Sequence, residues 1–148
     1  MGLDNFTVSL SVRHPSIDPG EITRALGIEP RHSWKVGERR RAGEGERVGS
    51  SYRESYWTAE LRELGSLSGV ETEAALLQAV VHLRRAQPFF SRLQAEGATV
   101  ELLVEVTGEG EVALGLSPHL LSMLARAGFS VMLKLSPAAE SARRRKAG

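Results

Sequence analysis

The chain has 148 residues, of which 41% are hydrophobic and 25% are charged, and its formal net charge is +1. This length and composition are typical of a single globular domain. Because the sequence contains no cysteine, a disulfide framework, a thiol nucleophile and cysteine-ligated metal sites are excluded. The amino terminus lacks a signal-peptide pattern and the apolar runs are too short to span a membrane, so we expect a soluble, cytoplasmic protein.

The first third of the chain predicts a strand and then a short helix. Residues 6–12 alternate between apolar and polar side chains, as in a strand with one buried face. A helix should follow, with Asp18 or Ser16 as its N-cap, Pro19 in its first turn and Gly27 as its C-cap. We expect its buried stripe to consist of Ile22, Ala25 and Leu26.

Two extended segments should come next. Residues 28–36 and 52–61 each have a strand-like pattern, and a loop rich in glycine and serine separates them. Each segment contains one tryptophan, Trp34 in the first and Trp57 in the second. We therefore expect a cross-strand contact between the two indole rings inside the core.

The rest of the chain predicts two more helices and three more strands. Apolar residues spaced three or four apart over 72–96 indicate a helix that Pro88 should break near Gln87. A strand over 98–107 should turn and return through Leu116 as a β-hairpin. A short helix from Ser117 to Gly128 and a final strand complete the expected domain.

The predicted order is βαββαββαβ. It favours an α+β fold in which a mostly antiparallel sheet carries its helices on one face. The first six elements are similar to a ferredoxin-like β-α-β-β-α-β unit, to which a β-α-β extension is added. We expect one domain over residues 1–136 and a basic, disordered tail over residues 137–148.

Positive charge is concentrated in one internal segment. Residues 31–53 contain seven Lys or Arg and three Glu, a net charge of +4, and the four basic residues at 143–146 add another +4. Such a segment can attract an anionic partner. It can also be a solvated loop, because 16 arginines against 3 lysines suggest a composition bias rather than selection for arginine.

We predict a non-catalytic binding or partner-interaction module with a basic rim at residues 31–56, where a protein partner or a small anion binds. Arginine suits this role because its guanidinium group donates paired hydrogen bonds to carboxylate and phosphate groups. No catalytic residue, metal ligand or cofactor is assigned, since the sequence contains no HExxH, GxSxG or phosphate-loop motif. The expected anion contacts are Arg31, Arg39, Arg40 and Arg53, and the flanking surface is Tyr52 and Tyr56.

Other functions stay open at this stage. One alternative is a hydrolase or transferase in which His14 or His32 works with a neighbouring carboxylate. A second is nucleic-acid binding, with residues 39–41 and the basic tail neutralising phosphates and the nearby tyrosines stacking on bases. A third is a small protein that masks a toxin or an enzyme. A homodimer through an edge strand, either the final or the first strand, is also consistent with the pattern.

The stretch from residue 22 to residue 61 resembles a small bacterial family catalogued as domain of unknown function 4279. The likeness extends over about residues 6–135. It implies a fold and no activity, and its pattern residues are structural in type, which supports packing roles for both tryptophans. The matching positions are Ile22, Leu26, Gly27, Pro30, Gly37 and Trp57.

Overall fold

The computed structural model of the chain describes residues 5–39, 50–61, 72–108 and 115–137. Within these ranges it contains five strands, four α-helices and one short 3-10 helix. The elements are β1 (Asn5–His14), α1 (Pro19–Leu26), β2 (His32–Trp34), β3 (Ser55–Glu60), α2 (Thr72–Leu83), η2 (Arg84–Ala86), α3 (Gln87–Ala95), β4 (Thr99–Gly108), α4 (Pro118–Ala127) and β5 (Phe129–Pro137).

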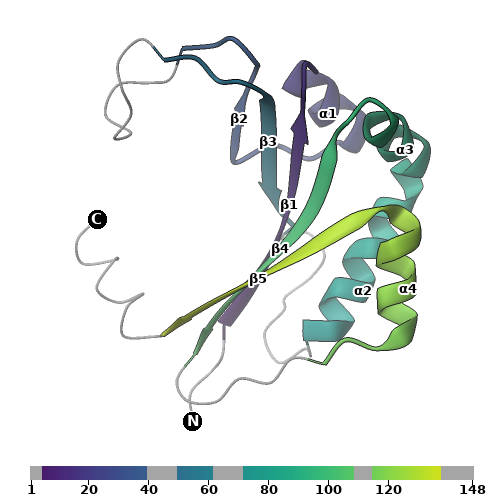
Figure 1. Ribbon diagram of the computed structural model, residues 1–148. Coiled ribbons are helices and arrows are strands. Elements are labelled where there is room, and N and C mark those ends of the chain that lie inside the picture. The colour runs from purple at the N-terminus through teal and green to yellow at the C-terminus, as the bar shows by residue number, and fades with distance from the viewer. Residues whose placement is uncertain (1–4, 40–49, 62–71, 109–114, 138–148) are drawn as a thin grey trace.

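The strands form a single sheet in the order β2-β3-β1-β4-β5. All neighbouring strands are antiparallel except β4 and β5, which are parallel and are connected through α4. All four α-helices lie on the same side of this sheet (Figure 1). The predicted α+β class, with a mostly antiparallel sheet and helices on one face, is confirmed, whereas the ferredoxin-like comparison stays a prediction.

The core lies between the helices and one face of the sheet. Val8, Leu10 and Val12 of β1 are buried, and the register places them opposite Val104, Leu102 and Val100 of β4. Successive side chains of a strand point to opposite faces, so the residues between them occupy the other face. This second face, which we call the open face, carries no helix among the described residues (Figure 1).

The helix ends follow the sequence signals closely. Asp18 caps α1 by accepting a hydrogen bond from the Gly20 N–H group, and Gly27 ends the helix with a positive φ of 68°. Ile22 is buried as expected, but Ala25 is exposed, because it lines a groove on the helix side instead of contacting the sheet. Pro88 lies in the first turn of α3, and the helical path breaks just before it, at η2.

The hairpin predicted after β4 is wrong for the part of it that the structure describes. Leu116 is not part of a strand, and residues 109–114 lie outside the described part of the chain. The pairing explains this result, since β1 occupies one edge of β4 and β5 occupies the other along almost its whole length.

The predicted tail falls outside the described residues beyond Pro137. None of the described helices has the length and apolar character needed to cross a membrane.

Candidate functional site

The chain segments that follow β2 and precede β3 continue side by side beyond the sheet. We call residues 35–39 and 50–54 the arm; in Figure 1 it extends from the ends of β2 and β3. The Gly37 N–H group donates to the Tyr52 carbonyl at 2.9 Å, and the Tyr52 N–H group donates to the Glu38 carbonyl at 3.0 Å. A bridge between Arg39 and Ser51 continues this pairing. The basic segment therefore begins on a paired, hydrogen-bonded scaffold rather than in an open loop.

Three aromatic rings pack together where the arm meets the sheet. The Trp34 and Tyr52 rings stack with their centroids 4.3 Å apart and their planes 12° apart. Tyr56 lies opposite Trp34 in the strand register, with its ring centroid 4.7 Å from that of Trp34. All three side chains are partly exposed. We call these three residues the aromatic stack. They form a packed, partly solvent-exposed surface at the end of β2.

The predicted contact between Trp34 and Trp57 is wrong. Trp57 is fully buried on the core face, and its indole N–H group donates to the Thr23 hydroxyl at 3.0 Å. The register places Ser33 opposite Trp57 and places Trp34 opposite Tyr56. Because neighbouring positions of a strand face opposite sides, the two tryptophans lie on opposite faces of the sheet.

A cavity of about 290 Å³ lies beside the aromatic stack. The positively charged residue of its lining is Arg31, with the imidazole of His32 next to it in sequence. Trp34 and Tyr52 form an aromatic wall, and Glu38 is the acidic residue of the lining. The Arg31 N–H group donates to the Thr58 carbonyl at 2.7 Å, which anchors this residue's backbone to β3. The lining residues of this rim cavity are Pro30, Arg31, His32, Ser33, Trp34, Glu38 and Tyr52.

The predicted site residues are brought together only in part. Arg31 and Tyr52 line the rim cavity. Arg39 and Arg53 are exposed on the arm without lining the cavity, and Tyr56 reaches the site through the aromatic stack. Arg40 lies outside the described residues. Across the described ranges, no carboxylate lies within ion-pair distance of Arg31, Arg39 or Arg53.

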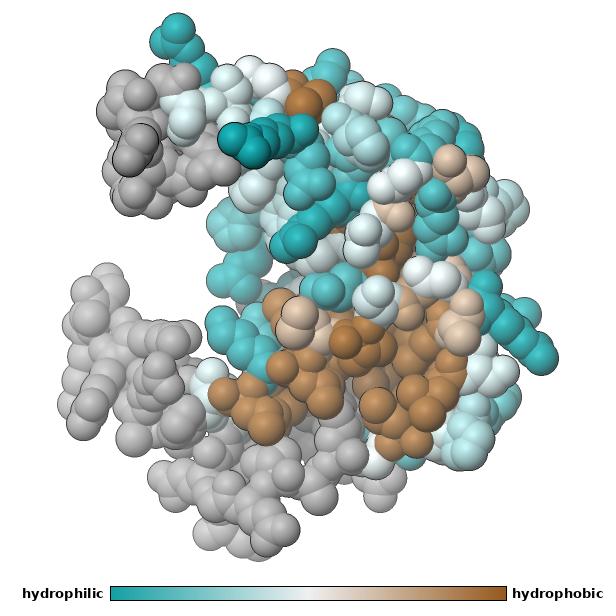
Figure 2. All heavy atoms as spheres, in the orientation of Figure 1, coloured by the Kyte–Doolittle hydropathy of each residue, from teal (hydrophilic) through white to brown (hydrophobic). Residues whose placement is uncertain are grey.

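The structure adds residues to the anion site that the sequence analysis did not place in it; of these, His32 had been considered only as a catalytic candidate. Trp34 and His32 line the rim cavity, and the Arg13 guanidinium group lies 5.9 Å from the centre of the Tyr56 ring. The signal for Arg13 was present, because the alternation of the first strand already placed it on the polar face. The signal for Trp34 was hidden, since its face depends on the pairing register with β3. Hydrophilic side chains gather over the top of the sheet in Figure 2, where β2, β3 and the end of β1 lie.

His14 and His32, each considered alone as a catalytic candidate beside a carboxylate, lie well apart in the sheet. His14 pairs with Ser55 and His32 pairs with Thr58, so two strand spacings and three residues separate them. His14 is 4% exposed, and its Nδ1 atom accepts hydrogen bonds from the N–H groups of Ser16 and Ile17, each at 2.9 Å. Its Nε2 atom therefore carries the proton and donates to Glu96 at 2.8 Å. The Nδ1 atom thus holds the turn after β1, and the Nε2 atom links His14 to Glu96 at the end of α3.

A metal site needs several His, Asp or Glu side chains close together. Among the residues that the structure describes, no group of three or more His, Asp or Glu side chains is arranged to hold a metal ion. His32 lines the rim cavity together with Arg31 and Glu38. The arrangement offers positive charge, hydrogen-bond donors and an aromatic wall, which are the components of a binding site.

Comparison with known proteins adds a family. No curated protein and no solved structure matches the chain. The sequence profile of the family described as "Domain of unknown function (DUF4279)" matches residues 4–137, which include all five strands and all four α-helices. The chain therefore belongs to the DUF4279 family.

Proposed function

We propose that this protein is a non-catalytic cytoplasmic binding module that takes an anionic group at the rim cavity. The observation that carries the proposal is the placement of Arg31 beside the aromatic stack in a cavity of about 290 Å³. A guanidinium group next to aromatic faces can bind a carboxylate or phosphate while the rings contact the apolar part of the same ligand.

The site is held in place before any ligand arrives. Arg31 is anchored by its backbone to β3, and the stacked rings of Trp34 and Tyr52 are fixed between β2 and the arm. A preformed site loses less conformational entropy on binding than a mobile loop does. This rigidity favours specific recognition over the solvated-loop interpretation of the basic segment.

The ligand proposed is either a small anion or an acidic segment of a protein partner. Both present the same chemistry, a carboxylate or phosphate group, to Arg31. Glu38 also lines the cavity. Its carboxylate would repel a second negative charge on the ligand and can accept a hydrogen bond from a donor group of the ligand. The best ligand therefore combines an anionic group with a nearby hydrogen-bond donor, as the backbone of an acidic peptide does.

The test uses three defined probes: inorganic phosphate, an oligo-aspartate peptide and a single-stranded oligothymidylate. Each is titrated into the wild type, Arg31→Gln and Arg126→Gln. Arg126 is an exposed arginine on α4, on the helix side, and serves as the matched control. Losing one charge-assisted contact should weaken binding about tenfold in Arg31→Gln, with Arg126→Gln unchanged.

The probes also separate the classes of ligand. Saturable binding of phosphate or oligo-aspartate that depends on Arg31 supports the proposal. Tight binding of oligothymidylate alone, with an affinity that falls steeply as salt rises, would replace it with nucleic-acid binding. Binding that is equal in both arginine variants would remove the rim cavity as the site.

A further inference from the structure

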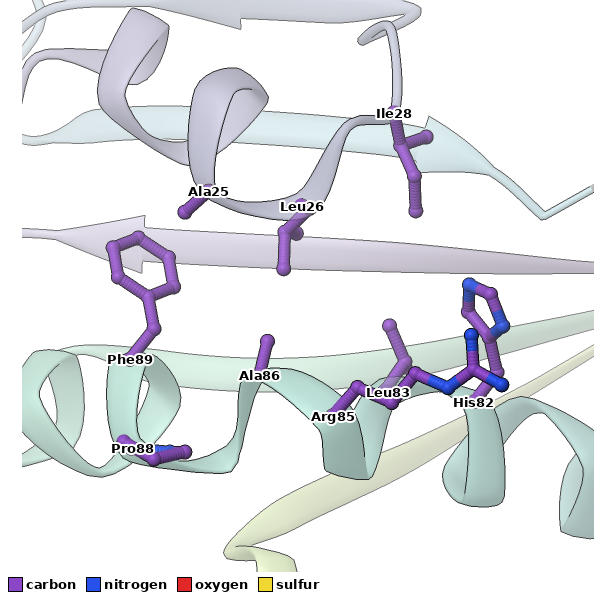
Figure 3. Close-up of a pocket in the computed structure, with 9 residues that line it drawn as sticks. All are labelled: Ala25, Leu26, Ile28, His82, Leu83, Arg85, Ala86, Pro88 and Phe89. Atoms are coloured by element: carbon purple, nitrogen blue, oxygen red, sulfur yellow. The ribbon is translucent and has the colours of Figure 1, made fainter.

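A second cavity lies on the opposite side of the sheet, among the helices. It has a volume of about 410 Å³ and lies between the end of α1 and the segment that connects α2 to α3 (Figure 3). This volume is within the range of about 300–1,000 Å³ that is typical of small-molecule pockets. We call it the helix groove. Its lining residues are Ala25, Leu26, Ile28, His82, Leu83, Arg85, Ala86, Pro88 and Phe89.

The groove has an apolar body and one basic end. Leu26 and Ala86 extend toward each other from its two walls in Figure 3, with Phe89 toward one end. The side chains of His82 and Arg85 lie side by side at the other end. The positions from 82 to 89 span about 10 Å along the helical path at 1.5 Å per residue. The groove is therefore a short apolar slot that ends in two hydrogen-bond donors.

The two walls are tied together near the apolar end. Glu21 of α1 forms an ion pair with Arg92 of α3. The Arg92 guanidinium group also lies 5.2 Å from the centre of the Phe89 ring, which it holds in place. The hydrogen bond that the guanidinium group donates to Glu21 raises the pKa of Arg92, so the guanidinium group keeps its charge. The spacing of the walls is thus set by side-chain contacts that do not involve a ligand.

The basic end lacks a counter-charge within the described ranges. Arg85 and His82 are both exposed, and no carboxylate of the described residues lies within ion-pair distance of either. A ligand carboxylate at this end would supply that counter-charge, and an attached hydrocarbon would cover the apolar walls. The chemical class that complements both features is a carboxylate with an attached alkyl chain.

We propose that the helix groove binds a medium-chain amphiphilic carboxylate, with the carboxylate on Arg85 and His82 and the alkyl chain directed toward Phe89. An extended octanoate chain has a length comparable to the slot. The helix groove and the rim cavity share no lining residue, so this proposal stands or falls independently of the proposed function.

The experiment titrates octanoate into the full chain by isothermal calorimetry, below its micellar concentration, with octanol and acetate as comparison ligands. Three variants are used. Arg85→Gln removes the charge, Ala25→Trp fills the groove from an exposed position, and Arg84→Gln is the matched control because Arg84 is exposed and does not line the groove. Arg85 is itself exposed, so the decisive variant keeps the fold.

We expect saturable binding of octanoate, with octanol and the Arg85→Gln variant each weakened about tenfold by the loss of the charge-assisted contact. Acetate should bind too weakly to measure, Ala25→Trp should abolish binding, and Arg84→Gln should bind as the wild type does. The proposal is overturned if octanoate does not saturate, if octanol binds equally well, or if Arg85→Gln retains full affinity.

Discussion

His14 shows how one buried side chain can stabilise a turn that the sequence pattern does not reveal. Its ring is almost fully enclosed and links three groups, the backbone N–H groups of Ser16 and Ile17 and the carboxylate of Glu96. The turn leads from the end of β1 into α1. Since both ring nitrogens take part in these bonds, the residue should contribute to the stability of the fold.

We predict that His14→Phe lowers the free energy of unfolding by about 2–4 kcal/mol, because two backbone donors lose their acceptor in a buried place. His14→Asn should restore part of this loss, since an asparagine side-chain oxygen can accept from N–H groups two residues on. Urea denaturation at neutral pH measures both. A His14→Phe protein as stable as the wild type would contradict this role.

Among the elements, β1 and the helix ends were predictable because local chemistry determines them, whereas β2 is shorter than the extended segment predicted over residues 28–36. Alternation in β1 and the cap residues Asp18, Gly27 and Ser117 correctly indicated where elements begin and end. What could not be predicted was pairing between segments that are distant in sequence. The face of Trp34 depends on its register with β3, and the rim cavity depends on the arm, neither of which has a local sequence signal.

Two helix C-caps provide a controlled comparison. Gly27 and Gly128 both have positive φ values, 68° and 75°. A Cβ atom added at Gly27 would meet nothing within 4 Å, whereas one at Gly128 would lie 2.7 Å from the Gln94 amide nitrogen. That amide donates to the carbonyl groups of Ala127 and Gly128, at 3.0 and 3.1 Å, and ties α3 to the end of α4.

Gly27→Ala should therefore cost about 1 kcal/mol of stability from backbone strain alone. Gly128→Ala should cost about 1 kcal/mol more, because Gln94 must move and its hydrogen bonds weaken. Thermal and urea unfolding of both variants measure the difference. Equal losses would mean that Gln94 does not stabilise this connection.

In the whole molecule, β5 is one of the two edge strands of the described sheet, and β2 is the other. Leu133 is 43% exposed and Leu135 is 62% exposed on β5. Figure 2 shows hydrophobic residues gathered along β5 toward α4, where Leu121 is also exposed. An exposed apolar edge strand is suited to pairing with another strand. A second copy fits, because antiparallel pairing about Met132 would place Val131 opposite Leu133 across a two-fold axis.

This arrangement predicts a homodimer in sedimentation velocity experiments at micromolar concentration. The double variant Leu133→Lys/Leu135→Lys should sediment as a monomer, because two charged side chains would then lie opposite the apolar Val131 and Phe129 of the second copy. Val81→Lys is the matched control, since Val81 is 53% exposed but lies on α2, away from this edge. A wild type that stays monomeric would contradict the edge pairing.

Anion binding in the rim cavity beside Trp34 can be tested most directly through the two tryptophans. The Trp34 ring lines the rim cavity, whereas the Trp57 indole N–H group is buried on the other face and bonded to Thr23. The measurement is the pair of indole N–H signals in a proton–nitrogen NMR titration with oligo-aspartate. Anion binding beside Trp34 should give a saturable shift of the Trp34 signal while the Trp57 signal stays in place. A titration in which the Trp34 signal does not move would contradict it.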